Sequence, residues 1–99
     1  MRIVKKRTLE DYWSAHADAT KPLQAWYQTA AAADWKTLSD VRATFPHADL
    51  VGRLTVFNIK GNSYRLVVRI EYKFHLIFVR WFGTHDDYDS GNWQQDDWF

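Results

Sequence analysis

The stretch VFNIKGNSYRLVVRIEY, residues 56–72, predicts the hairpin at the centre of the fold. Apolar and polar residues alternate on both sides of the tripeptide KGN, which is typical of two half-buried strands joined by a tight turn. In the second strand, every other position from Tyr64 to Tyr72 is apolar or aromatic. Arg65 and Arg69 occupy the opposite register, so they share the other face. We expect one face to be a core and the other a cationic surface.

The flanking sequence extends this hairpin into an α+β domain. Apolar residues recur at helical spacing before the hairpin, and a strongly apolar segment follows it. We therefore expect an N-terminal strand and two to three helices packed on one face of an antiparallel sheet. The expected elements are a strand at residues 2–6, a helix capped by Thr8, a helix from Thr20, a short helix ended by Pro46, and strands at 54–60, 64–72 and 75–82.

Length and composition are those of one folded domain. The chain has 99 residues, of which 46% are hydrophobic and 17% aromatic, so it is not of the disordered class. It has no cysteine, which excludes disulfides and thiolate metal sites. We find no secretory signal and no apolar run of membrane-spanning length. The expectation is a soluble, cytoplasmic protein with no membrane partner.

The near-zero net charge conceals a segregation along the chain. Residues 51–82 carry six Lys or Arg and a single Glu, whereas residues 83–99 carry five Asp and no Lys or Arg. A basic sheet region favours a polyanionic partner, because Lys and Arg displace counterions from phosphates. An ordinary solvated strand face is equally compatible with these charges.

The stretch GTHDDYD, residues 83–89, is the candidate for chemistry. We expect Gly83 to let the chain turn, so that His85 and Tyr88 stand beside the strand that carries Arg80. An imidazole can pass protons, a phenol can donate a hydrogen bond, and a guanidinium can stabilise charge at phosphorus. These are the parts of a ribonuclease in which a 2′-hydroxyl attacks the adjacent phosphate. On spacing alone, a structural turn remains an alternative.

Arg80 interrupts an otherwise apolar strand. A buried, unpaired guanidinium is costly, so this side chain must either reach solvent or find a partner. If it reaches solvent, it adds to the cationic face. The alternative is an ion pair with Glu71 or with an aspartate of the C-terminal region.

No metal or cofactor is expected. The aspartates at 86, 87 and 89 lack the glycine-containing pattern of a calcium loop, and the four histidines have no matched helical spacing. The chain also has no glycine-rich phosphate loop and no nucleophilic serine motif.

Two motifs resemble those of HigB-type toxins of the RelE superfamily. VFNIKGNSYRL is similar to the hairpin of that family, and FVRWFGTHDDYD is similar to its terminal THxEYD motif. The resemblance spans roughly residues 3–89. It implies a RelE-like fold and a cytoplasmic, metal-independent mRNA endoribonuclease that acts in the ribosomal decoding site. It also implies a helix-turn-helix antitoxin and a toxin–antitoxin hetero-oligomer.

The resemblance assigns roles to particular residues. Asn58, Gly61 and Asn62 match the hairpin and are expected to serve its geometry, and Asp87 stands where Glu is usual. The expected catalytic residues are Arg65, Arg80, His85 and Tyr88, and the expected RNA-binding residues are Lys60, Arg69 and Lys73.

The resemblance divides the chain into a toxin domain, residues 1–89, and a polar, acidic tail, residues 90–99. The tail carries Trp93 and Trp98, which we expect to be exposed, and we expect it to be mobile. Its charge suggests that it either shields the cationic face or docks with a partner.

Two other functions remain compatible with the sequence. A non-catalytic RNA- or ribosome-binding module would use the same basic face and aromatic rings but would not need a proton carrier. A protein-binding domain would use the basic face to meet an acidic partner.

Overall fold

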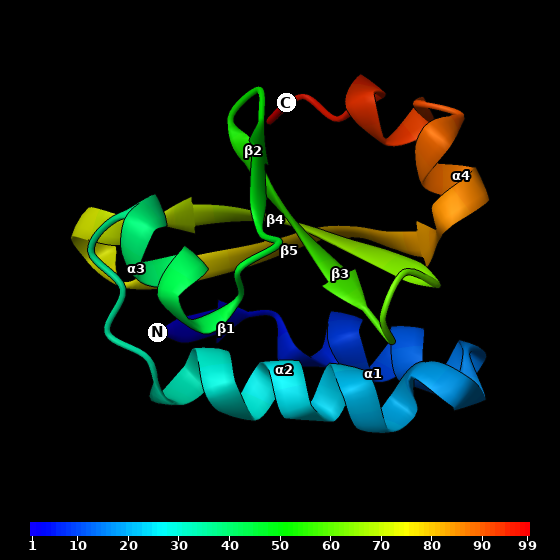
Figure 1. Ribbon diagram of the computed structural model, residues 1–99, viewed down its shortest axis with the longest axis horizontal. Coiled ribbons are helices and arrows are strands. Elements are labelled where there is room, and N and C mark those ends of the chain that lie inside the picture. The colour runs from blue at the N-terminus through cyan, green and yellow to red at the C-terminus, as the bar shows by residue number, and fades with distance from the viewer.

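The structure, a computed structural model, describes residues 1–99 and consists of one sheet with helices on both of its faces (Figure 1). The long elements follow the sequence prediction closely, and short helical turns connect them. In chain order the elements are β1 (Arg2–Val4), α1 (Lys6–Ala15), η1 (Ala17–Ala19), α2 (Thr20–Ala32), α3 (Leu38–Thr44), β2 (Asp49–Val51), β3 (Leu54–Ile59), β4 (Tyr64–Glu71), η2 (Tyr72–Phe74), β5 (Leu76–Thr84), α4 (His85–Asp89) and η3 (Asn92–Gln95).

The sheet has five strands in the order β1-β5-β4-β3-β2. Strand β1 runs parallel to β5, and every other neighbouring pair is antiparallel. This architecture confirms the predicted α+β class. Strand β2 was not predicted, because its three residues, DLV, are too few to show an alternation. It pairs with β3 around Gly52, whose φ of 61° allows the tight reversal.

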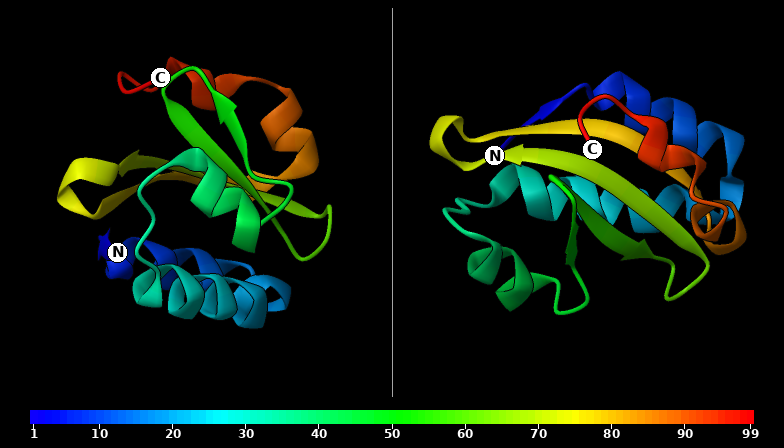
Figure 2. Two further views of the ribbon diagram at one scale, coloured as in Figure 1. Left: turned by 60° about the vertical axis from the view of Figure 1, so that its left-hand side comes forward. Right: turned by 90° about the horizontal axis from the view of Figure 1, so that it is seen from above.

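Helices α1 and α2 cover one face of the sheet, hereafter the inner face (Figures 1 and 2). The apolar register of β4 points into this core as predicted, and Leu66 and Val68 are completely buried there. Each such side chain contributes about 2 kcal/mol by leaving water. A shift of β4 by one residue would bring the arginines inside, so burial fixes the register.

The helix boundaries correct one prediction and confirm another. Helix α1 begins at Lys6, and Lys5 at its N-cap makes no side-chain capping bond, so Thr8 lies inside the first turn rather than capping it. Helix α2 begins at Thr20 as predicted. The Thr20 hydroxyl donates to the carbonyl of Trp13 at 2.8 Å, which joins the start of α2 to α1.

The tail differs most from the prediction. It folds back over the face opposite α1 and α2, hereafter the outer face (Figure 2). Trp93 is only 3% exposed, so the prediction of an exposed tryptophan there is wrong. The prediction failed because the tail's partners come from strands that are distant in sequence. Together these residues form a second, smaller core, the outer-face cluster, of Leu54, Val56, Val67 and Trp93.

None of the helices is long and apolar enough to cross a membrane.

Candidate active site

The outer face holds two separate groups of predicted site residues. Arg65, His85 and Tyr88 meet where β4 begins and β5 ends. Arg80 lies further back along β5 and contacts the tail instead. We call the first group, together with Asn62 and Asp89, the Arg65 cluster.

Helix α4 positions two members of this cluster. Strand β5 continues to Thr84, whose hydroxyl accepts a hydrogen bond from the Asp87 amide at 3.1 Å and so caps a short helix. The backbone amide of His85 donates to the carbonyl of Ser63 at 3.0 Å, which fixes the start of α4 against the hairpin turn. The predicted turn is therefore a helical turn, and it presents His85 and Tyr88 from a rigid support.

A chain of side-chain contacts connects Arg65 to His85. Arg65 Nη2 donates to Asn62 Oδ1 at 2.6 Å, and Asn62 Nδ2 lies 3.4 Å from His85 Nδ1. On the other side of the ring, His85 Nε2 lies 3.3 Å from Asp89 Oδ2. When Asn62 donates to Nδ1, the ring proton resides on Nε2 and faces Asp89. The imidazole is thus held from both sides.

Asn62 does more than the turn requires. The residues of the loop with positive φ are Lys60 (53°) and Gly61 (62°), and Asn62 is not among them. Its side chain is therefore not needed for the backbone conformation that asparagine tolerates in turns. It instead orients Arg65 and His85. Sequence reasoning missed this role because a KGN tripeptide is a sufficient turn signal by itself.

Tyr88 stacks between a cation and a tryptophan. Its ring centre lies 5.8 Å from the Arg65 guanidinium carbon and 4.8 Å from the Trp93 ring, which is nearly parallel to it at 11°. Burial raises the pKa of the Tyr88 phenol, the nearby Asp49 and Asp89 add to the rise, and Arg65 opposes it. Tyr88 therefore carries its proton at neutral pH and can donate a hydrogen bond.

Gly83 has a different role from the predicted one. It lies within β5, opposite Arg65 in the β4 register, and does not have a positive φ. A Cβ atom there would stand 2.6 Å from the indole of Trp81, so the missing side chain makes room for that ring. Trp81 in turn borders Tyr88, with ring centres 6.3 Å apart. Gly83 thus provides space beside the cluster rather than a turn.

Arg80 reaches the outer face by the regular alternation of β5. Ile77 is buried in the inner core and Val79 packs against that core, so Arg80 points to the opposite face. A β-bulge follows: Val79 and Trp81 pair with consecutive residues of β4, which leaves Arg80 as the extra residue. The bulge shifts the alternation, so that Trp81 also packs against the outer-face cluster and Phe82 returns to the inner core.

The tail neutralises Arg80. Its Nε and Nη2 atoms donate to the two carboxylate oxygens of Asp96, each at 2.9 Å, and the Trp98 ring centre lies 4.1 Å from its guanidinium carbon. Burial works to raise the pKa of Asp96, but hydrogen bonds from Arg80 and the Trp98 amide, with the charge of Arg80, lower it overall. Of the two alternatives for Arg80, the ion pair with an aspartate of the C-terminal region is the one observed.

The three predicted RNA-binding residues do not gather at one place. Lys60 turns toward η1, where its Nζ donates to Asp18 at 2.9 Å. Arg69 lies on the outer face and pairs with Glu71 at 2.8 Å. Lys73 lies in η2, beyond the far end of β4 from Arg65, with its Nζ 5.6 Å from the Phe74 ring. Of these three, only Arg69 shares the face of the Arg65 cluster.

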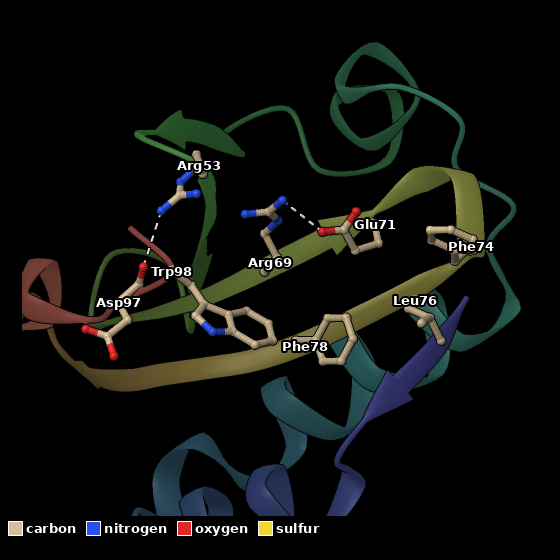
Figure 3. A pocket seen from close by; sticks show the side chains of 8 residues that line it. All are labelled: Arg53, Arg69, Glu71, Phe74, Leu76, Phe78, Asp97 and Trp98. Carbon is tan, nitrogen blue, oxygen red and sulfur yellow. Dashed lines mark hydrogen bonds and ion pairs between the residues drawn. The ribbon is translucent and has the colours of Figure 1, made fainter.

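A cavity of about 490 Å³ opens between the tail and the η2 end of the sheet (Figure 3). Trp98 and Phe78 lie side by side along it, with ring centres 5.0 Å apart. It is lined by Arg53, Arg69, Glu71, Phe74, Leu76, Phe78, Asp97 and Trp98. The cavity combines aromatic surfaces with two guanidinium groups.

A model of the HigB toxin family, described as the RelE-like toxic component of a toxin–antitoxin system, matches residues 19–91. The chain belongs to the HigB toxin family. The mRNA interferase toxin HigB of Escherichia coli (strain K12) is 26% identical over 92 residues, which cover 90% of this chain and 88% of that relative. The proteins named mRNA interferase HigB of Escherichia coli O157:H7 and Shigella flexneri match to the same extent.

Membership of the HigB family confirms the predicted resemblance, and with the observed fold it confirms the RelE-like architecture. A toxin of such a system has an antitoxin as its partner. The family match includes the whole Arg65 cluster and Arg80 but ends before η3. The segment that covers Arg80 therefore lies outside the part of the chain that matches the HigB family model.

Proposed function

We propose that this HigB-family chain is an mRNA endoribonuclease that inhibits translation. The observation that carries the proposal is the Arg65 cluster, where a guanidinium, an oriented imidazole and a protonated phenol meet on one open side of the sheet. The three relatives with matching sequence are named mRNA interferases, which supports the same activity here.

Each member of the cluster suits one step of phosphodiester transfer. His85 takes the proton from a 2′-hydroxyl at Nδ1, where that hydroxyl replaces the 3.4 Å contact with Asn62, and the 2′-oxygen attacks the adjacent phosphorus. Arg65 binds the phosphate and stabilises the negative charge that grows on its oxygens. Tyr88 gives its proton to the 5′-oxygen that leaves. The products are a 2′,3′-cyclic phosphate and a 5′-hydroxyl end, and the proton gained by His85 returns to Tyr88 through solvent before the next turnover.

The proposal extends to the partners of this chain. The substrate is mRNA in the decoding site of a translating ribosome, so the chain acts in the cytoplasm. The antitoxin of this toxin is a helix-turn-helix protein, and the two chains form a hetero-oligomer.

The test is cleavage of a defined mRNA, mapped by primer extension with and without ribosomes. Cuts are expected only with ribosomes, and His85→Ala should remove most of them while ribosome binding persists. His47→Ala is the matched control, because His47 is exposed and lies before β2, away from the cluster. Near wild-type cleavage by His85→Ala would refute the role of His85. Intact mRNA with the toxin bound to ribosomes would instead favour a non-catalytic binding module.

A further inference from the structure

The last residues of the tail hold a guanidinium and an aromatic surface in the way that a nucleotide would. Asp96 presents two anionic oxygens to the fork of Arg80, and Trp98 lays its ring over the same guanidinium and against Phe78. A phosphate accepts the same pair of hydrogen bonds from arginine, and a base stacks on aromatic and guanidinium planes as an indole does.

This segment is compact and separable from the rest of the tail. Within it, the Trp98 amide donates to Asp96 Oδ1 at 2.7 Å, and the Phe99 amide donates to the Asp96 carbonyl at 2.9 Å. Trp93, before it, also has an anchor outside the segment, since it is buried and its Nε1 donates to the Tyr88 carbonyl at 3.0 Å. Residues 96–99 can therefore leave the sheet while η3 stays in place.

The segment is held by the packing of Phe99 and by a small number of polar contacts. The Phe99 ring lies edge-on to Trp93, with ring centres 5.5 Å apart. Besides the contacts of Asp96 and Trp98, the Arg53 amide donates to the Phe99 carbonyl at 2.9 Å, and Arg53 Nη2 donates to the Asp97 carbonyl at 3.2 Å. The cavity described above borders the segment and contains Arg69, so an incoming strand has space beside it (Figure 3). The segment is thus poised to be replaced rather than buried permanently.

We propose that Arg80 and Phe78 form a nucleotide subsite for the RNA, and that Asp96 and Trp98 occupy it as an internal mimic of phosphate and base. This inference rests on the proposed function, since it places a further nucleotide of the same substrate. RNA and the tail exclude one another at this site. Only molecules whose tail is displaced bind RNA here, so the apparent dissociation constant is the intrinsic one divided by the fraction of molecules with an open tail.

Binding is measured apart from cleavage with a short 2′-O-methyl RNA, which lacks the attacking hydroxyl, by fluorescence polarisation. Asp96→Asn removes the ion pair with Arg80 and should tighten binding about tenfold, as a loss of one charge-assisted pair predicts. Asp97→Asn is the matched control: it removes an equal charge one residue later, where the carboxylate has no ion pair. It should change affinity by less than about twofold. Equal effects of the two variants would overturn the proposal.

Two further variants locate the effect at the subsite. Truncation after Gln95 removes the mimic but keeps Trp93, and it should tighten binding at least as much as Asp96→Asn. In an Arg80→Ala background, Asp96→Asn should have no effect, because the site that the carboxylate occupies is gone. A full gain in that background would show that Asp96 acts through general charge alone.

Displacement itself is visible by amide hydrogen exchange in residues 96–99. Adding the 2′-O-methyl RNA should accelerate exchange there, since the tail leaves the sheet. Slower exchange would mean that RNA binds on top of the tail, and the proposal would be wrong. Failure of the proposed function is distinguishable from failure of the subsite. A chain that binds RNA with these responses but never cuts mRNA would support the subsite and refute the endoribonuclease activity.

Discussion

Arg65 and Arg80 lie on neighbouring strands of one sheet face, yet their partners differ in charge. Arg65 donates to the side-chain oxygen of Asn62 and to the backbone carbonyls of Asn62 and Tyr64, all of which are neutral. Arg80 donates to a carboxylate that lies only 16% exposed. The first guanidinium keeps its charge for a ligand, whereas the second has its charge cancelled until that carboxylate moves. An outward position on the sheet therefore does not by itself make an arginine available to bind a ligand, because the charge of its partners also decides this.

The two arginines also differ in how they are oriented. Arg65 follows the regular alternation of β4 and is fixed by the hairpin turn. Arg80 lies at a bulge in β5 and is covered by a segment outside the part of the chain that matches the HigB family model. The Arg65 cluster is therefore the expected centre of chemistry, and Arg80 is expected to bind and position RNA.

The largest effect should come from Arg65. Arg65→Ala removes the group that stabilises charge at phosphorus and releases Asn62, so cleavage should fall about 10²-fold or more. Arg65→Lys keeps the charge but loses the planar fork, and it should recover only part of the rate. Arg7→Ala on α1 serves as the control arginine, because its side chain is exposed on the other side of the sheet and pairs with Asp11 of the same helix. Cleavage is measured by single-turnover kinetics on programmed ribosomes, and full activity of Arg65→Lys would show that charge alone suffices.

A smaller effect should come from the residue between Arg65 and His85. Asn62→Asp still accepts the bond from Arg65 but cannot donate to His85 Nδ1. We expect kcat to fall about tenfold, the equivalent of one orienting hydrogen bond, while KM stays unchanged. Asn62→Ala should lower kcat and also raise KM, since Arg65 is freed. If Asn62 serves only the turn, both variants will change stability and leave the pH profile of kcat unaltered.

Much of the fold could be predicted because its signals are local. The alternation of β4, the KGN turn and the helical spacing before them each depend on neighbouring residues. Strand β2 and the start of α1 were missed because three residues show no period and because α1 begins without a capping side chain. The register of β4 is not set by these local signals alone. It is fixed by the burial of Leu66 and Val68 on the inner face.

For the candidate site, the sequence indicated which residues come together but not how they are arranged. Arg65, His85 and Tyr88 meet as expected, because the ends of paired antiparallel strands lie together. The bulge at Arg80 was not predictable, and the sequence offered a C-terminal aspartate only as one of several alternatives for this guanidinium, because the choice depends on which distant segments share the outer face. Lys60 also depends on a distant partner. It lies at the hairpin turn as predicted, but its ammonium group pairs with Asp18 on η1 instead of joining the Arg65 cluster.

The smallest expected effect is a pH dependence of the free energy of unfolding, which we expect from the ion pair of Arg80 but not from the contacts of Arg65. The partners of Arg65 do not titrate in acid, but the pKa of Asp96 is lowered in the folded chain, so its carboxylate form stabilises the fold above its ordinary pKa near 3.8. That contribution, about 1 kcal/mol for a partly buried pair, is lost as pH falls through the lowered value. The difference in free energy of unfolding between wild type and Asp96→Asn should therefore shrink below pH 4. The measurement is urea unfolding across this pH range, with Asp97→Asn as the control for the loss of one charge in the tail. A constant difference for Asp96→Asn would mean that the pair with Arg80 does not stabilise the closed tail.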